Sequence, residues 1–418
     1  MNSIPNSHQS HGGCGAEKGL ISVDQALHMI LGQTQCLAPE YVPLSQALNR
    51  YLAQAIYSKI NLPMFSQSAV DGYAICTEQA TQMAGKQFEL IGEIRAGQCA
   101  EITLEMGQAV RIFTGAKLPE NTTTVARQEI VTVTADHICL TDALKCHVDI
   151  RERGEEVAVG QLLAAAGQPL NVGAIACLSM AGETAVEVLK YPKIAVVITG
   201  DEVAEHVEDL NSGKIFDANA PLIQAWFQSQ GQTVDILHVA DTAPEVTALF
   251  DRLKHDYDLI LSTGGVSVGD YDFVRPVALA QGFEQVFWKV KQKPGKPMLF
   301  ADYQRQNGSH CYLLGLPGNP AAVYVGMQIY LSTLLQALQG QKKLPHWMSG
   351  IMQHDLQVNA RERFLRMTAQ FQHGQLQLNS LSNQQSHMLS NLMQANCLVR
   401  VPAGQRILAG MSLQGLFI

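Results

Sequence analysis

Apolar and polar residues follow different periods in different parts of the chain, and the changes of period predict its division into domains. Between residues 191 and 340, short apolar runs alternate with amphipathic stretches of helical length, which is typical of parallel strands joined by helices. This region is predicted to be a doubly wound α/β domain. The expected strands are residues 193–200, 233–238 and 257–263, and the expected helices are residues 221–231, 243–255 and 321–338.

Two other regions carry the two-residue alternation that is typical of half-buried strands. Residues 61–143 predict a β domain inserted into the chain, and residues 341–418 predict a small C-terminal β-barrel. The expected strands are residues 88–94, 109–113 and 129–134 in the first region, and residues 375–379, 397–401 and 413–418 in the second.

Residues 21–60 and 144–190 flank the inserted β domain and are expected to form one discontinuous N-terminal module. Helices are predicted to begin at Ser22 and Asn171, since both residue types favour the N-cap position, and a further helix is expected over residues 44–51. Together the four regions predict a multidomain α/β plus β protein.

Residues 1–20 are rich in Ser, Asn, Gly and His and are expected to be a disordered leader. A metal-binding tail formed by His8, His11 and Cys14 is the alternative interpretation of this segment.

Composition excludes several classes of protein. A net charge of −8 gives no general basic surface for nucleic acid. The nine cysteines are never spaced Cys-x-x-Cys, which fits a reducing compartment and predicts no structural zinc. The longest apolar stretch, residues 321–338, contains Gly326 and Gln328 and predicts a core helix rather than a membrane span. No signal peptide is expected, so the predicted location is the cytoplasm.

Three Gly-rich turns each follow an apolar run, at residues 262–269, 293–297 and 315–320. Glycines let backbone N–H groups approach a ligand closely, and a helix that begins after such a turn favours an anion there. Asn319 and Pro320 are suited to the N-cap and first position of the helix after the third turn. The alternative for each turn alone is a tight strand-to-helix connection, but together they predict an anion site. Its expected cations are Lys289, Lys293 and Lys296.

Carboxylates follow the expected strands of the α/β domain, where ligands bind in sheets of this kind. They are Asp201, Glu202, Asp241, Asp270 and Asp272. Helix capping and solvation explain any one of them, and Asp270 in particular can cap the next helix. Several carboxylates that face lysines and a phosphate-binding loop are better explained by a hydrated Mg²⁺ bound beside the anion.

Six motifs, in this order along the chain, resemble those of the molybdopterin molybdenumtransferases, the MoeA family, which includes the E domain of gephyrin. They are residues 68–74, 113–116, 199–202, 264–272, 293–297 and 315–320. The resemblance runs from about Leu20 to Ile418. It implies an elongated N-terminal module, an inserted β domain, a molybdopterin-binding α/β domain, a C-terminal β-barrel, and a homodimer whose sites are shared between protomers.

The resemblance also implies an activity. Enzymes of this family take adenylyl-molybdopterin and molybdate, cleave the adenylate with the help of a divalent cation, and form molybdenum cofactor with release of AMP. The expected cofactor is Mg²⁺, and a molybdopterin adenylyltransferase is a candidate partner. No nucleic acid or membrane partner is expected.

The family's functional positions are carried over residue by residue. Those matching catalytic positions are Asp71, Thr114, Glu202, Asp241, Asp272, Lys289 and Lys293, of which Asp272 and Glu202 are the candidate metal ligands. Those matching substrate-binding positions are Gly264, Gly265, Ser267, Gly269, Lys296, Pro317, Gly318, Asn319, Arg366, Ser386 and Glu156. By the resemblance, Asp71 and Thr114 reach the site of the partner protomer, and Arg366 and Ser386 contribute to a molybdate pocket.

Two positions depart from the family pattern. Members often have Val-Ser after Gly-Asn-Pro, whereas this chain has Ala321-Ala322, so one hydroxyl near the expected molybdate pocket is missing. Many members have Gly-Glu-Asp where this chain has Gly154-Glu155-Glu156, which moves a carboxylate outward by one methylene.

Two other functions remain open from the sequence. A receptor-binding scaffold resembling gephyrin would bind without a metal, and an adenylyltransferase would consume ATP with metal-free molybdopterin. The chain has no linked second catalytic domain and no extended low-complexity linker, which disfavours the scaffold. The additional domains and the motifs around Asp71 and Thr114 disfavour the adenylyltransferase.

Overall fold

The structure is a computed structural model that describes residues 19–98, 101–200, 203, 208, 211, 213–267, 269 and 272–418. The chain forms two compact units. One contains residues 39–188, and the other contains residues 189–418 together with the N-terminal residues up to 38.

The first unit contains a six-stranded sheet in the order β8-β4-β7-β6-β10-β9, and it confirms the β-rich character expected between residues 61 and 143. Buried apolar side chains pack on both faces of this sheet. The strands are β4 (Gly72–Ile75), β6 (Gln87–Ile94), β7 (Gln108–Ile112), β8 (Thr124–Arg127), β9 (Val131–Val133) and β10 (His137–Leu140), with a 3₁₀ turn η2 (Gln128–Ile130).

Short two-stranded pairings and one helix form the rest of this unit, around a separate apolar cluster. The strands are β1 (Pro39–Pro43), β2 (Ile56–Tyr57), β3 (Gln67–Ser68), β5 (Thr81–Gln82), β11 (Leu144–Lys145), β12 (Ile150–Arg151), β13 (Leu162–Ala164) and β14 (Ala185–Leu189). The helix is α2 (Val172–Met180), and the predicted N-cap is confirmed because the Asn171 side chain accepts a hydrogen bond from the backbone N–H of Ala174.

The helix predicted over residues 44–51 is wrong. Only a single 3₁₀ turn, η1 (Leu44–Gln46), forms there. Asn49 then adopts a φ of 63°, and its backbone N–H donates to the carbonyl of Leu170 at 2.8 Å. Leu52 next forms a β-bridge with Val188. Pairing with distant backbone therefore replaces the helix that local propensity favoured.

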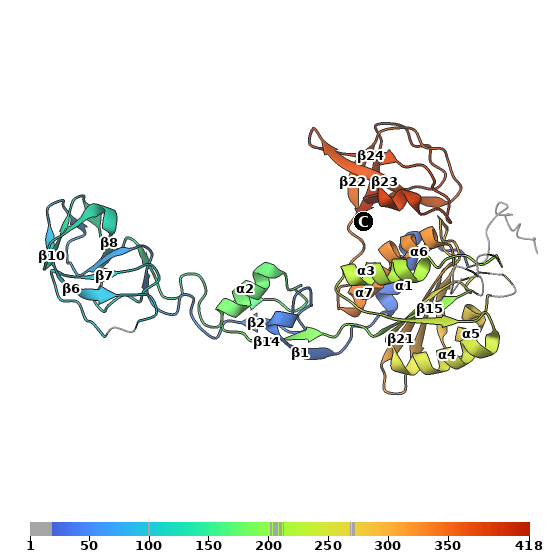
Figure 1. Cartoon of the computed structure of the whole chain (residues 1–418), viewed down its shortest axis with the longest axis horizontal. Helices are drawn as coiled ribbons and strands as arrows, with labels where there is room; N and C mark the ends of the chain where they lie inside the picture. Colours follow the sequence, from blue (N-terminus) through green and yellow to red (C-terminus); the bar gives the residue numbers. More distant parts are fainter. Residues whose placement is uncertain are drawn as a thin grey trace, which may run out of the picture. The chain divides into compact units, whose positions relative to one another are not determined.

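The second unit contains the predicted doubly wound α/β domain. Its sheet has the order β16-β15-β17-β21-β20-β18, in which the first four strands are parallel. Helices α1, α3, α6 and α7 cover one face, and α4 and α5 cover the other (Figure 1). The strands are β15 (Ile194–Thr199), β16 (Asp235–Val239), β17 (Leu259–Thr263), β18 (Glu284–Trp288), β20 (Leu299–Gln304) and β21 (His310–Leu316). The helices are α1 (Val23–Gln33), α3 (Asn219–Ser229), α4 (Ala243–Asp256), α5 (Val274–Ala280), α6 (Pro320–Gly326) and α7 (Ser332–Leu338).

Two of these helices show how sequence sets local structure. α1 begins where predicted, because Ser22 forms a capping box with Gln25. The apolar helix expected after residue 320 also forms, but a π-helical segment, η4 (Met327–Leu331), separates α6 from α7. Residues Pro320–Leu338 are long and apolar enough to cross a membrane, yet 78% of the most apolar window is buried inside the protein, as expected for a core helix.

The C-terminal strands close into a ring, which confirms the predicted β-barrel. The order is β23-β24-β22-β26-β25, and β25 pairs back to β23. A short strand of the α/β domain's turn, β19 (Gln292–Lys293), adds to β23 in parallel. The ring strands are β22 (Met348–Met352), β23 (Glu362–Gln372), β24 (Gln375–Ser380), β25 (Cys397–Val401) and β26 (Ser412–Phe417), with a 3₁₀ turn η5 (Ser390–Met393).

Candidate functional site

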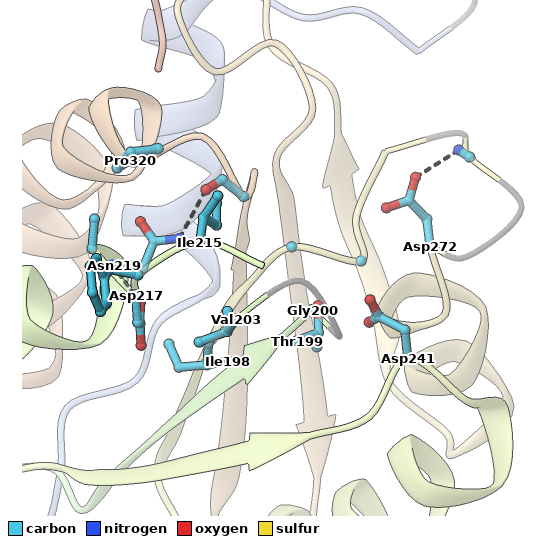
Figure 2. Close-up of a pocket in the computed structure, with 16 residues that line it drawn as sticks. Ile198, Thr199, Gly200, Val203, Ile215, Asp217, Asn219, Asp241, Asp272 and Pro320 are labelled. Atoms are coloured by element: carbon cyan, nitrogen blue, oxygen red, sulfur yellow. Dashed lines mark hydrogen bonds between the residues drawn. The ribbon is translucent and has the colours of Figure 1, made fainter. Parts of the chain in front are cut away.

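The strand order of the α/β sheet reverses at β15, which lies between β16 and β17. Loops leave the carboxyl ends of β15 and β17 in opposite directions at such a point, and the crevice between them is where ligands bind in open α/β sheets. A pocket of about 350 Å³ lies there (Figure 2). Its lining includes Thr199 and Gly200 after β15, Gly264 and Gly265 after β17, and Gly318 after β21.

Two of the three predicted Gly-rich turns meet at this pocket, and the backbone of the first requires glycine at two positions. Gly264 has a φ of +85°, and a Cβ on it would lie 2.6 Å from Oγ1 of Thr199. Gly265 has a φ of +65°, and a Cβ on it would lie 2.6 Å from Cγ2 of the buried Val274. A Cβ on Gly318 would lie 3.7 Å from Cα of Gly264, so bare backbone from both turns faces the pocket.

Three carboxylates line the pocket: Asp217, Asp241 and Asp272. Figure 2 shows Asp217 on one side and Asp241 and Asp272 on the other. Oδ2 of Asp272 accepts a hydrogen bond from the backbone N–H of Gly269 at 2.6 Å, which fixes the carboxylate against the glycine loop. The predicted residues Asp201, Glu202 and Asp270 lie outside the described part of the chain.

Two residues that line this pocket, Asp217 and Asn219, were not predicted from the sequence. Oδ1 of Asp217 accepts from the backbone N–H groups of Asn219 and Ala220, at 2.8 and 3.1 Å, and so caps the start of α3. Nδ2 of Asn219 donates to the carbonyl of Gly318 at 2.8 Å, while its Oδ1 is buried without a partner in the structure. The sequence signal that could have identified them was Asp217-Ala218-Asn219 at the start of helix α3.

The three predicted lysines are not among the lining residues of this pocket. Nζ of Lys289 lies 4.2 Å from the centre of the Trp288 ring, and the Trp288 indole donates to the carbonyl of Val266 at 2.8 Å, inside the glycine loop. Lys293 lines a second cavity, of about 160 Å³, beside the barrel. Lys296 is partly buried in the same turn, and its backbone carbonyl accepts from the N–H of Val290.

Arg366 is buried in the barrel, with 1% of its surface exposed. Its guanidinium donates to the backbone carbonyls of Asn383, Gln385 and Met388. The carbonyl of Ser386, in the same loop, accepts from the backbone N–H of Ala321 at 3.0 Å. In this conformation Arg366 orders the loop that carries Ser386 and holds it against the first turn of α6.

The turn of residues 315–320 agrees in part with the prediction that Asn319 and Pro320 begin a helix. Asn319 occupies the N-cap position of α6 and Pro320 follows it, but the Asn319 side chain makes no capping hydrogen bond. Asn319 and Gly318 are exposed, whereas Pro317 is buried. Ser267 of the glycine loop is also exposed. These positions leave Asn319 and Ser267 accessible to a ligand.

Family models match nearly the whole chain. The MoeA N-terminal region (domain I and II) covers residues 21–182, a probable molybdopterin binding domain covers residues 195–337, and the MoeA C-terminal region (domain IV) covers residues 350–414. The chain is 30% identical to a molybdopterin molybdenumtransferase of Staphylococcus epidermidis over 92% of both chains. It is 32% identical to that of Haemophilus influenzae, over 91% of this chain and 94% of the relative.

The chain belongs to the molybdopterin molybdenumtransferase family. It is therefore a transferase of molybdenum cofactor biosynthesis. A crystal structure of the molybdopterin biosynthesis MoeA protein from Pyrococcus horikoshii has a TM-score of 0.79 at 23% identity, and the match covers 96% of this chain and 100% of that one. This agreement extends the family's multidomain α/β plus β fold to the present chain.

Asp71 and Thr114 lie together in the first unit. Oδ1 of Asp71 accepts from both the backbone N–H and the hydroxyl of Thr114, each at 2.8 Å. The backbone and side-chain hydrogen bonds from Thr114 lower the pKa of Asp71, with a smaller effect of Arg111. Asp71 is thus an exposed carboxylate held in its charged form. Glu156 is exposed in the same unit, and its backbone N–H donates to the carbonyl of Leu62.

Proposed function

We propose that this chain inserts molybdenum from molybdate into adenylyl-molybdopterin, releasing AMP and forming molybdenum cofactor. The observation that carries the proposal is the pocket at the reversal of strand order, where Gly264, Gly265 and Gly318 present bare backbone opposite three carboxylates. Backbone N–H groups suit a phosphoanhydride, and a volume of about 350 Å³ lies in the range of small-molecule sites.

A divalent cation is part of the proposal, and the pocket fits one. The described residues contain no group of three or more His, Cys, Asp or Glu side chains that would enclose a metal ion. Mg²⁺ does not need such an enclosure, because it retains several waters and is bound through one or two carboxylates together with substrate phosphates. Asp272, together with Glu202, would hold the ion. When bound, Mg²⁺ would offset negative charge on the phosphoanhydride.

The side chains then have separate roles. Asp272 and Asp241 line the part of the pocket where the cation would bind. The hydrogen bond from the N–H of Gly269 holds the Asp272 carboxylate in place for this role. The glycine turns hold the phosphoanhydride in line for attack by water or a molybdate oxygen, and cleavage releases AMP. Lys289, Lys293 and Lys296 supply positive charge toward molybdate and the phosphates. We further place the reaction in the cytoplasm, in a homodimer in which Asp71 and Thr114 complete the site of the partner protomer.

The direct test is release of AMP from adenylyl-molybdopterin by the purified protein, with molybdate and Mg²⁺ each present or omitted. We expect release only when both are present, and none after the cation is removed with a chelator. A folded protein that releases no AMP under any of these conditions would contradict the proposal. Consumption of ATP with metal-free molybdopterin would instead identify an adenylyltransferase.

A further inference from the structure

The side chain of Trp288 connects the glycine loop after β17 with a lysine that is expected to contact the substrate. Trp288 is the last residue of β18 and pairs with Leu299 of the neighbouring strand β20, so the sheet fixes its backbone. Its side chain is partly buried and packs against the apolar cluster between the sheet and helices α4 and α5. The indole Nε1 donates to the carbonyl of Val266 at 2.8 Å. A strand of the sheet therefore anchors the glycine loop through one side-chain hydrogen bond.

The same side chain also carries two cations. Cζ of Arg275, in the first turn of α5, lies 4.0 Å from the centre of the Trp288 ring, and Nζ of Lys289 lies 4.2 Å from it. Both cations are within about 6 Å of the centre, the range in which the negative face of an aromatic ring attracts a cation. Since α5 begins shortly after the glycine turn, Trp288 contacts the chain both within this loop and just beyond it.

The backbone of Lys289 sets the direction of its side chain. Lys289 has a φ of 75°, in the left-handed region that residues other than glycine rarely adopt. Its N–H donates to the carbonyl of Met298 at 3.0 Å, and its carbonyl accepts from the N–H of Ile21 at 3.3 Å. Rare backbone conformations persist where the surrounding structure fixes them, and they are concentrated at functional sites. In this conformation the Lys289 ammonium lies over the ring of the preceding residue.

We propose that Trp288 is a positioning residue of the transfer reaction, which holds the glycine loop and the Lys289 ammonium in fixed positions relative to each other. A lysine ammonium sits on a flexible stem and loses conformational freedom when it binds an anion. Contact with a ring that is itself bonded to the loop restricts this freedom before the substrate binds, so the cation is already in place beside the loop. The inference rests on the proposed function, because that proposal assigns Lys289 and the loop to the substrate.

The first test is the rate of AMP release from adenylyl-molybdopterin in two Trp288 variants. Trp288→Phe keeps an aromatic face for the cations but loses the N–H that binds Val266, and we expect kcat/KM to fall about fivefold. Trp288→Leu loses both contacts, and we expect a fall of about thirtyfold. Trp347→Phe is the matched control, because this tryptophan also carries a cation, Cζ of Arg400 at 5.3 Å, but lies directly before barrel strand β22. Its kcat/KM should equal that of the wild type.

A double-mutant cycle distinguishes positioning from a merely structural role. Lys289→Gln removes the charge, and its effect on kcat/KM is measured in the wild type and in Trp288→Leu. If Trp288 acts through Lys289, the loss caused by Lys289→Gln is at least about threefold smaller in Trp288→Leu than in the wild type. Equal losses in the two backgrounds would overturn the proposal. If Trp288→Leu does not fold, the cycle uses Trp288→Phe, in which the ring is no longer bonded to the loop, and equal losses again overturn the proposal.

A second readout does not depend on turnover. Trp226→Phe and Trp347→Phe together leave Trp288 as the only tryptophan, and inorganic pyrophosphate with Mg²⁺ is the probe. Pyrophosphate should change the emission of Trp288, because the indole is bonded to the loop, and Lys289→Gln should weaken this binding at least about threefold. Unchanged emission at saturating pyrophosphate, or unchanged affinity in Lys289→Gln, would refute the link between ring, lysine and loop.

The outcome is separable from that of the proposed function. If the chain releases no AMP, the proposed function fails, and the emission of Trp288 still tests whether the ring links Lys289 to the loop. If the chain releases AMP but Lys289→Gln causes equal losses with and without Trp288, the inference about Trp288 alone fails.

Discussion

Replacement of Asp272 by asparagine is expected to lower the rate of AMP release by about 10²–10³-fold, the typical cost of losing one electrostatic contact to a transition state. The amide oxygen of asparagine can still accept the hydrogen bond that the Gly269 N–H donates to Asp272, so the loop retains its anchor. The variant loses only the negative charge that would hold Mg²⁺ against the phosphoanhydride. We expect the loss in kcat, with partial recovery at high Mg²⁺ concentration.

The control for this prediction is Asp256→Asn, which removes an exposed aspartate at the end of α4, outside the pocket lining. Its rate should equal that of the wild type. Full activity in Asp272→Asn, with a circular dichroism spectrum like that of the wild type, would remove Asp272 from the mechanism.

Replacement of Gly265 by alanine is the second change with a large expected effect. A φ of +65° costs an alanine about 1–2 kcal/mol. The new Cβ would also lie 2.6 Å from Cγ2 of Val274, a buried residue at the start of α5, and such overpacking costs a further 1–3 kcal/mol or so. Relief of the contact would move the glycine loop, so AMP release should fall as well as stability.

The variant Gly231→Ala separates the cost of the positive φ from the cost of the contact with Val274. Gly231 has nearly the same φ, +69°, but a Cβ on it would meet no atom within 4 Å. Urea unfolding followed by tryptophan fluorescence reports on the unit of residues 189–418, because all three tryptophans, Trp226, Trp288 and Trp347, lie in it. Equal losses of stability in the two variants would show that the contact with Val274 has no effect.

The sequence was sufficient for features that depend on local pattern. Three strands of the α/β sheet, β15, β16 and β17, follow from hydrophobic periodicity, as do helices α3 and α4 and the helical stretch after Pro320. Strands β18, β20 and β21 and helix α5 were not predicted. The glycine turns follow from the backbone conformation that only glycine adopts easily. The six motifs identified the family, which the comparisons confirmed. The roles of Asp71, Thr114, Asp241, Asp272 and the lysines stay predictions.

Local sequence pattern could not predict the features that depend on pairing between residues distant in the chain. Residues 44–51 lost their helix because Asn49 and Leu52 pair with backbone more than a hundred residues away. Asn219 became a pocket residue only through its contact with Gly318, on a different turn. The position of Arg366 depends on its hydrogen bonds to the loop around Ser386, which form only in the folded barrel.

We propose that this chain transfers molybdenum to molybdopterin with cleavage of the adenylate. The most direct measurement is the ratio of AMP released to molybdenum incorporated into the pterin, determined with the wild-type protein, adenylyl-molybdopterin, molybdate and Mg²⁺. We expect one AMP for each molybdenum, and a product that activates a molybdenum-free apoenzyme. AMP release without molybdenum in the product would contradict it, because the chain would then be a hydrolase of the adenylate and not a molybdenumtransferase.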